Sequence, residues 1–231
     1  KDGVGLEATV NDIAENPHNV EIVELAAEQV ARVAEETSYI VLNGNYALQA
    51  GYSVAKDALA YEKSDSEAAK TYVNVIAVKE GNENSDKIKA LVDVLKSDEI
   101  KDFINEKYDG AVVSTVENPG NGYDASVDYD ALKGTEITVA ASPTPHAEIL
   151  DVAKEILAAK GVALKIVEFT DYVQPNNVVD SGDIDANYFQ HLPYLEDFND
   201  QNGTNVVSVA AIHVEPMGLY GGKQTTLDAL K

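Results

Sequence analysis

Residues 136–169 read EITVAASPTPHAEILDVAKEILAAKGVALKIVEF, and this stretch decides the fold. Glu136–Ala141 and Ala163–Phe169 are apolar runs of strand length. Between them, His146–Lys160 carries apolar residues at helical spacing, and Gly161 follows in the place of a left-handed helix cap. A strand, a helix and a strand of these lengths predict a right-handed crossover between two parallel strands.

Similar signals alternate through most of the remaining chain. Short apolar runs predict strands at Tyr39–Leu42, Tyr72–Val78 and Asn205–His213. Helical spacing of apolar residues predicts a helix over Ser85–Lys96. The alternation predicts an α/β fold with mainly parallel sheets. Residues 114–134, rich in glycine, asparagine and aspartate, interrupt it and are expected to form a linker or a long surface loop.

The composition limits the classes of function. The chain has 231 residues and a net charge of −23, from 40 acidic and 17 basic residues. Such a surface repels phosphate backbones, so we expect no nucleic-acid partner. The absence of cysteine excludes thiol catalysis, disulfides and thiolate metal sites. No stretch has the length of a transmembrane helix and no signal segment opens the chain, so we expect a mature or truncated soluble portion whose membrane anchor lies outside it.

No group of residues has the spacing of a catalytic site. Gly3–Ala8 loosely fits a dinucleotide fingerprint, but no strand precedes it, which favours a glycine loop before a helix. Gly51–Ala55 loosely fits a nucleophile elbow, although Ser53 is better placed as a helix N-cap. His213 and Glu215 could supply two metal ligands, but alternation along a strand explains their spacing. We therefore expect a protein that is not an enzyme and holds no cofactor and no metal.

Three stretches at strand ends suit a pocket for a small ligand. Phe169–Asn176 follows a buried strand at its carboxyl end, where open α/β sheets bind ligands. Asp185–Tyr194 combines three aromatic residues, two amides and a histidine, and Asn43–Ala47 ends a strand with amides and an aromatic residue. A well-packed strand–helix corner would explain the same composition equally well. The binding hypothesis predicts that the three stretches converge on one cleft.

Longer motifs resemble those of one protein family, in the stretches Thr144–Leu150, Val167–Asn176, Asp185–Tyr194 and Glu215–Tyr220. Asn43–Ala47, Tyr72–Val78 and the helical stretch that ends at Tyr108–Val113 are similar to later segments of the same family. The family is the methionine-binding lipoproteins, the NlpA-type substrate-binding proteins of ABC importers. The resemblance covers nearly all of the chain except Ser114 to about Lys133.

The motifs stand in a circularly permuted order, because the family begins with the segment that starts here at Glu136 and continues later with the segment that starts here at Lys1. This order leaves open a natural permutant, an engineered rearrangement or a piece of two tandem copies, and the linker composition favours a natural or tandem origin. The resemblance also implies that one strand–helix unit is missing, with an arginine expected to hold the ligand carboxylate. The single arginine, Arg32, lies in a stretch that matches a different helix.

The resemblance implies a circularly permuted α/β fold like that of type II periplasmic binding proteins, with two lobes and a hinge. Lobe 1 would span residues 72–213, including the linker at 114–134, and an incomplete lobe 2 would combine residues 1–71 with 214–231. Carried over motif by motif, the ligand-binding residues would be Tyr172, Tyr188, Phe189 and His191 from lobe 1, and Asn43 and Tyr46 from lobe 2.

The implied function is an extracytoplasmic substrate-binding protein that captures methionine or a related amino acid for an ABC permease. It would sit at the cell surface or in the periplasm, lipid-anchored through a segment outside this chain. The alternative is a permuted or truncated fragment with weak or no ligand binding that acts as an assembly or structural module. An unfilled sheet position predicts either a domain-swapped or face-to-face homodimer, or a missing part on a longer precursor.

Overall fold

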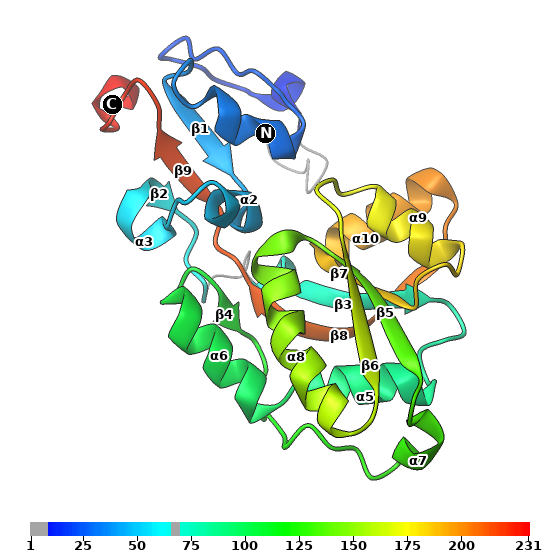
Figure 1. Cartoon of the computed structure of the whole chain (residues 1–231). Coiled ribbons are helices and arrows are strands. Elements are labelled where there is room, and N and C mark those ends of the chain that lie inside the picture. The colour runs from blue at the N-terminus through cyan, green and yellow to red at the C-terminus, as the bar shows by residue number, and fades with distance from the viewer. Residues whose placement is uncertain (1–8, 66–69) are drawn as a thin grey trace.

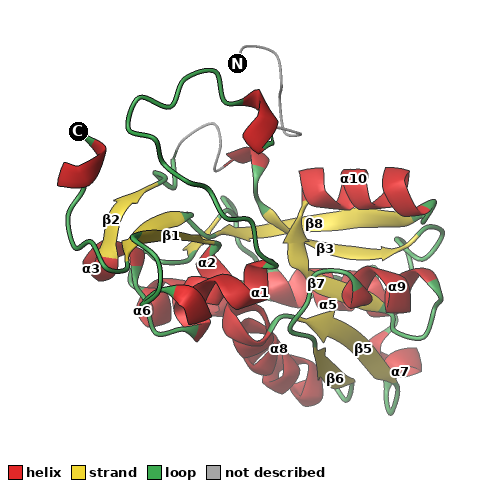
Figure 2. Ribbon diagram, turned by 90° about the horizontal axis from the view of Figure 1, so that it is seen from above, coloured by secondary structure: helices red, strands yellow, loops and turns green. Residues whose placement is uncertain are grey.

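The computed structural model describes residues 9–65 and 70–231, which form two β-sheets with helices packed on them (Figures 1 and 2). The glycine motif at Gly3–Ala8 lies outside the described residues. One sheet has six strands in the order β4-β8-β3-β7-β5-β6, and the other has three in the order β1-β9-β2. No described helix is both long enough and apolar enough to cross a membrane.

The six-stranded sheet contains the predicted crossover. Its strands are β3 (Asn74–Lys79), β4 (Val113–Ser114), β5 (Glu136–Ala141), β6 (Ala163–Glu168), β7 (Ala186–His191) and β8 (Val206–Val214). Strand β5 runs parallel to both of its neighbours, β6 and β7. Strand β3 inserts between β7 and β8 and runs antiparallel to both, and β4 is antiparallel to β8. The prediction of mainly parallel sheets is therefore wrong, because apolar runs reveal strands but not the direction of their neighbours.

Helices cover both faces of this sheet. They are α5 (Asp86–Leu95), α6 (Asp98–Tyr108), α8 (Glu148–Ala159), α9 (Gln174–Asp180) and α10 (Leu192–Asn202), with the short α1 (Ala27–Val30) and α7 (Tyr129–Leu132) elsewhere. Ile76 and Val78 of β3 join the core formed with α5 and α8, whereas Ala77 packs with residues of α9 and α10 on the opposite face. Figure 2 shows α10 on one side of β3 and β8. Because β3 is covered on both faces, its residues are buried throughout their apolar run.

The ends of these helices follow ordinary capping chemistry. Ser85 and Ser97 accept hydrogen bonds from backbone N–H groups three residues later, and so cap α5 and α6. Gly161 adopts φ +80° just after α8, as its position predicted. Helix α8 begins two residues later than predicted, because an irregular turn over Pro143–Ala147 precedes it. Thr144 is extended there, as expected for a residue that precedes a proline.

The three-stranded sheet joins the two ends of the chain. Strands β1 (Tyr39–Leu42) and β2 (Ala58–Tyr61) both pair with β9 (Gly218–Gly221), antiparallel in each case. Figure 1 shows β9, from the end of the chain, lying beside β1. Helices α2 (Gly44–Gln49) and α3 (Val54–Asp57) follow β1. Ser53 is the N-cap residue of α3 by position, although its side chain makes no capping hydrogen bond.

Two predictions about this architecture stay open. The two sheets draw their strands from the residue ranges assigned to the two lobes, but the lobe boundaries themselves stay a prediction. Within the described part of the chain, β1 pairs on one side only, and Val41 on this strand is 53% exposed. The predicted swapped assembly also stays a prediction.

The predicted linker packs against the helices of the six-stranded sheet rather than standing free. Val116, Val127 and Leu132 are buried. Gly120 exchanges backbone hydrogen bonds with the segment between α5 and α6, donating to the carbonyl of Lys96 and accepting from the N–H of Asp98. Residues 114–134 are thus an ordered surface segment that includes α7.

Candidate functional site

A cavity of about 930 Å³ is lined by strands of the six-stranded sheet and by residues that adjoin the strands of the smaller sheet. Asn43, Gly44 and Asn45 reach it from the end of β1 and the start of α2, with Met217 before β9. The larger sheet contributes Tyr72 and residues of β3, β7 and α10. Its volume is within the range of pockets that enclose small molecules.

Four of the six predicted ligand-binding residues line this cavity. They are Asn43, Tyr172, Phe189 and His191. Asn43 follows β1, Tyr172 follows β6, and the other two lie on β7. Strand ends that are far apart in sequence therefore meet at one space, as the binding hypothesis required. The direct contact of these residues with a ligand stays a prediction.

The other two predicted residues, Tyr46 and Tyr188, are not among the lining residues. The Tyr46 hydroxyl donates to the carbonyl of Thr170 at 2.7 Å, and its ring lies 5.1 Å from that of Tyr172. Tyr188, also on β7, is completely buried, and its hydroxyl contacts His213. The next three residues of β7 all line the cavity, at an irregularity in the pairing of β7 with β3. Both tyrosines are placed to support the wall of the cavity from behind.

An aromatic wall forms one side of the cavity. The rings of Tyr172, Phe189 and Tyr194 lie about 6 Å apart, between 5.9 and 6.1 Å from centroid to centroid. The Tyr194 hydroxyl donates to the backbone carbonyl of Tyr172 at 2.7 Å, which fixes the two segments together. Such a wall suits an apolar side chain or a cationic group, because ring faces attract both.

Two buried amides, which the sequence analysis did not single out individually, also line the cavity. Asn45 and Asn74 are 3% and 1% exposed. The Asn45 Oδ1 atom accepts from the Tyr172 hydroxyl at 2.6 Å, and Asn74 Oδ1 accepts from the Nε2–H of His146 at 2.8 Å. The Nδ2 atoms of both amides have no hydrogen-bond partner among the described residues. A buried donor without a partner is costly, so these two groups are suited to meet an acceptor on a bound molecule.

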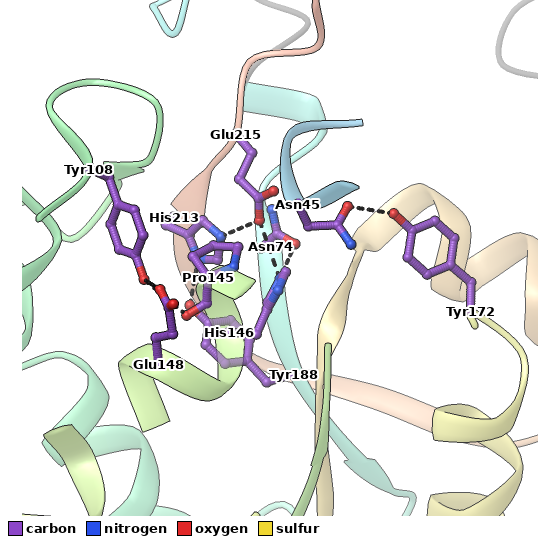
Figure 3. A network of polar contacts seen from close by, with 10 residues as sticks. All are labelled: Asn45, Asn74, Tyr108, Pro145, His146, Glu148, Tyr172, Tyr188, His213 and Glu215. Carbon is purple, nitrogen blue, oxygen red and sulfur yellow. Dashed lines mark hydrogen bonds and ion pairs between the residues drawn. The ribbon is translucent and has the colours of Figure 1, made fainter. Parts of the chain in front are cut away.

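A buried polar cluster lies behind the amides (Figure 3). The Nε2–H of His213 donates to Glu215 Oε1 at 2.7 Å, and its Nδ1 atom accepts from the Tyr188 hydroxyl. The Nε2 atom of His146 lies 3.4 Å from the same carboxylate oxygen. Burial lowers the pKa of both histidines to about 3, and it raises the pKa of Glu215. Both imidazoles are therefore neutral at pH 7.

The two histidines and Glu215 offer three ligand atoms within 4.8 Å of one another, which is the spacing of a metal site. The hydrogen bonds favour a different interpretation. In this hydrogen-bonded arrangement each imidazole donates from the nitrogen that faces the carboxylate or Asn74, because these oxygens accept. The cluster is explained as a hydrogen-bonded support at the crossover from β8 to β9.

Gly44 packs tightly against this support. A Cβ atom at position 44 would lie 2.4 Å from the Cβ of Glu215 and 2.9 Å from its Oε2. We expect Gly44→Ala to lower the free energy of unfolding by about 1–3 kcal/mol, because overpacking forces the neighbours to shift. Urea denaturation measures the change, with Gly120→Ala as control, because a Cβ there meets no atom within 4 Å. Equal stability of the two variants would contradict the packing.

Comparison with known proteins supports the motif resemblance. A model of the NlpA lipoprotein family matches residues 1–116 and 137–231. The chain belongs to this family. The matched residues of this NlpA family member leave out the packed segment between β4 and β5.

Individual relatives match this NlpA chain over part of its length. It is 44% identical over 114 residues to the methionine-binding lipoprotein MetQ of Bacillus subtilis, which covers 48% of this chain and 40% of the relative. A solved lipoprotein structure from Ruminococcus gnavus is 79% identical, with a TM-score of 0.48, and the match covers 49% of this chain and 46% of that one. The chain thus spans less than half the length of these relatives.

A more distant structure matches nearly the whole fold. The phosphate-binding protein of a phosphate ABC transporter from Streptococcus pneumoniae superimposes with a TM-score of 0.52, over 90% of this chain and 79% of that one. The sequences are only 11% identical, so the match concerns the fold alone. The α/β fold of this NlpA family member is thus of the periplasmic-binding-protein kind.

Proposed function

We propose that this chain is an extracytoplasmic substrate-binding protein that captures methionine or a closely related amino acid for an ABC importer. The convergence of Asn43, Tyr172, Phe189 and His191 on one cavity carries the proposal. The name of the Bacillus subtilis relative, a methionine-binding lipoprotein, supports the ligand class. The chain would act by binding rather than by catalysis, and a lipid anchor would hold it outside the cytoplasmic membrane beside its permease.

The cavity offers the contacts that a thioether amino acid requires. The aromatic wall of Tyr172, Phe189 and Tyr194 would surround the sulfur, and each sulfur–ring contact is worth about 0.3–1.5 kcal/mol. The amides of Asn45 and Asn74 would donate to the polar end of the ligand. Because the lining comes from the six-stranded sheet and from residues that adjoin the smaller sheet, a ligand would bridge them, and hinge closure at the β8–β9 crossover would trap it.

Titration calorimetry with L-methionine, D-methionine and a panel of other amino acids tests the proposal. We expect methionine to bind, and Phe189→Ala to weaken its binding at least about tenfold, since a buried phenyl ring contributes about 1.5–3 kcal/mol. The matched control is Phe103→Ala on α6, whose ring packs against Tyr108 away from the cavity lining. It is expected to bind like the unaltered protein.

Circular dichroism of each variant separates loss of binding from loss of fold. If no amino acid in the panel binds to the folded protein, capture of an amino acid is wrong, and the alternative of a structural module gains support. An equal loss of affinity in the Phe189 and Phe103 variants would show that the effect does not come from the cavity wall.

A further inference from the structure

The cavity has an unusual balance of charge for a site that would hold a free amino acid. Five carboxylates line it: Glu62, Glu196, Asp197, Asp200 and Glu215. No lysine or arginine is present among its lining residues in the described part of the chain. His191, the histidine of the lining, is largely enclosed, and burial lowers its pKa, so it supplies no full positive charge at neutral pH.

The donors that do reach the cavity are uncharged. The Nδ2 atoms of Asn45 and Asn74 are buried and lack partners among the residues described. Their Oδ1 atoms already accept hydrogen bonds, from Tyr172 and from His146. These bonds assign the orientation of each amide and leave the Nδ2 donors available for a bound molecule. Figure 3 shows Asn45 between Glu215 and Tyr172, so its amide stands next to a carboxylate.

These features select between the two charges of an amino acid. An ammonium group is attracted by the five carboxylates and by the faces of Tyr172, Phe189 and Tyr194. A carboxylate meets the same negative groups, and the described part of the lining offers no lysine or arginine to pair with it; like charges brought together at a binding site weaken the affinity. A neutral carbonyl oxygen accepts from the two amides without that repulsion.

We infer that this cavity prefers a ligand with an ammonium group and an uncharged carbonyl, such as an α-amino amide, to a free amino acid with its carboxylate. The inference rests on the proposed capture function and specifies the chemical class of its ligand. A free amide and the amino-terminal residue of a short peptide share this chemistry. The cavity of about 930 Å³ has room for more than one residue.

Titration calorimetry at pH 6.5 tests the inference with four probes: L-methionine, L-methioninamide, N-acetyl-L-methionine and the dipeptide methionyl-alanine. At this pH the α-amine of the amide is largely protonated. We expect methioninamide to bind about ten- to a hundredfold more tightly than methionine, and N-acetylmethionine to show no binding. If the dipeptide binds as tightly as methioninamide, the ligand is assigned as the amino-terminal residue of a short peptide. If the dipeptide binds more weakly, the ligand is assigned as a free amide.

A pair of matched variants ties the preference to the cavity. Glu196→Gln combined with Asp200→Asn removes two exposed carboxylates of the lining, and is expected to reduce the amide-to-acid preference several-fold. Asp151→Asn combined with Glu155→Gln removes the same charge from the exposed face of α8, outside the lining, and is expected to leave the preference unchanged. Equal effects of the two double variants would overturn the assignment to the cavity.

The outcomes separate this inference from the proposed function. Tighter binding of methionine than of methioninamide, or binding of N-acetylmethionine, would overturn the preference and leave methionine capture standing. Binding of none of the four probes to the folded protein would overturn both.

Discussion

Replacing Glu215 by alanine is expected to lower the free energy of unfolding by about 2–6 kcal/mol. The carboxylate accepts hydrogen bonds from the Nε2–H of His213 and from the backbone N–H of Asn45, and it is 4% exposed. Its removal leaves two buried donors without an acceptor, and each costs about 1–3 kcal/mol. Urea denaturation followed by circular dichroism measures the difference.

Two controls frame this result. Glu215→Gln keeps a carbonyl oxygen for His213 in the same place, so its cost is expected to be about 1 kcal/mol. Glu155→Ala changes an exposed glutamate of α8 and is expected to shift stability by less than about 0.5 kcal/mol. If Glu215→Ala were as stable as Glu155→Ala, the cluster in Figure 3 would not support the fold.

The buried histidines predict a loss of stability in mild acid. Burial holds the pKa of His146 and His213 at about 3, whereas an imidazole in an unfolded chain titrates near pH 6.5. Between these values the unfolded chain binds protons that the folded chain excludes. The contribution of the two neutral histidines to the free energy of unfolding is therefore complete above about pH 6.5. It is lost as the pH falls, by about 1.4 kcal/mol per pH unit for each histidine.

Glu215 acts in the opposite direction. Its raised pKa means that the folded chain binds a proton above the pH at which the unfolded chain does, so it gains stability as the pH falls. Where the two pH ranges overlap, this gain offsets part of the loss of stability that the two histidines cause. The net fall in stability with acidification is therefore less steep there than the two histidines alone would give.

Comparing the pH dependence of stability between variants separates the effect of His146 from that of the many surface carboxylates. His146→Gln retains a donor for Asn74 and removes one titrating group. As the pH is lowered, the free energy of unfolding of this variant should therefore decrease less steeply than that of the unaltered protein, by about 1.4 kcal/mol per pH unit. His18→Gln, at an exposed position, should follow the unaltered protein. Parallel curves for His146→Gln and the unaltered protein would mean that His146 is protonated in the fold.

The sequence predicted those elements that local chemistry determines. β1 and β5 coincide with their apolar runs, and α5 begins after the serine that caps it. Strand β9 was missed because Gly218–Gly221 has the composition of a turn and becomes a strand only between β1 and β2. Strand direction was missed for the same physical reason, since it depends on partners distant in the chain.

The candidate site divides in the same way. Aromatic and amide residues at strand ends are visible in the sequence and pointed to three stretches, and the family resemblance then implied Asn43, Tyr172, Phe189 and His191 within them. Asn74 lies inside an apolar run, and its amide is oriented by His146, 72 residues away. No local pattern predicts such a pairing, so the place of Asn74 in the polar lining required the folded structure.

The position of β9 has a consequence for the order in which the chain can assemble. Among the described strands, β1 and β2 do not pair with each other. Each pairs with β9, and Tyr39 lies opposite Gly221. A ribosome must therefore translate about 157 residues beyond β2, as far as Gly218–Gly221, before this sheet can acquire its central strand. Until then, β1 and β2 have no partner strand to pair with.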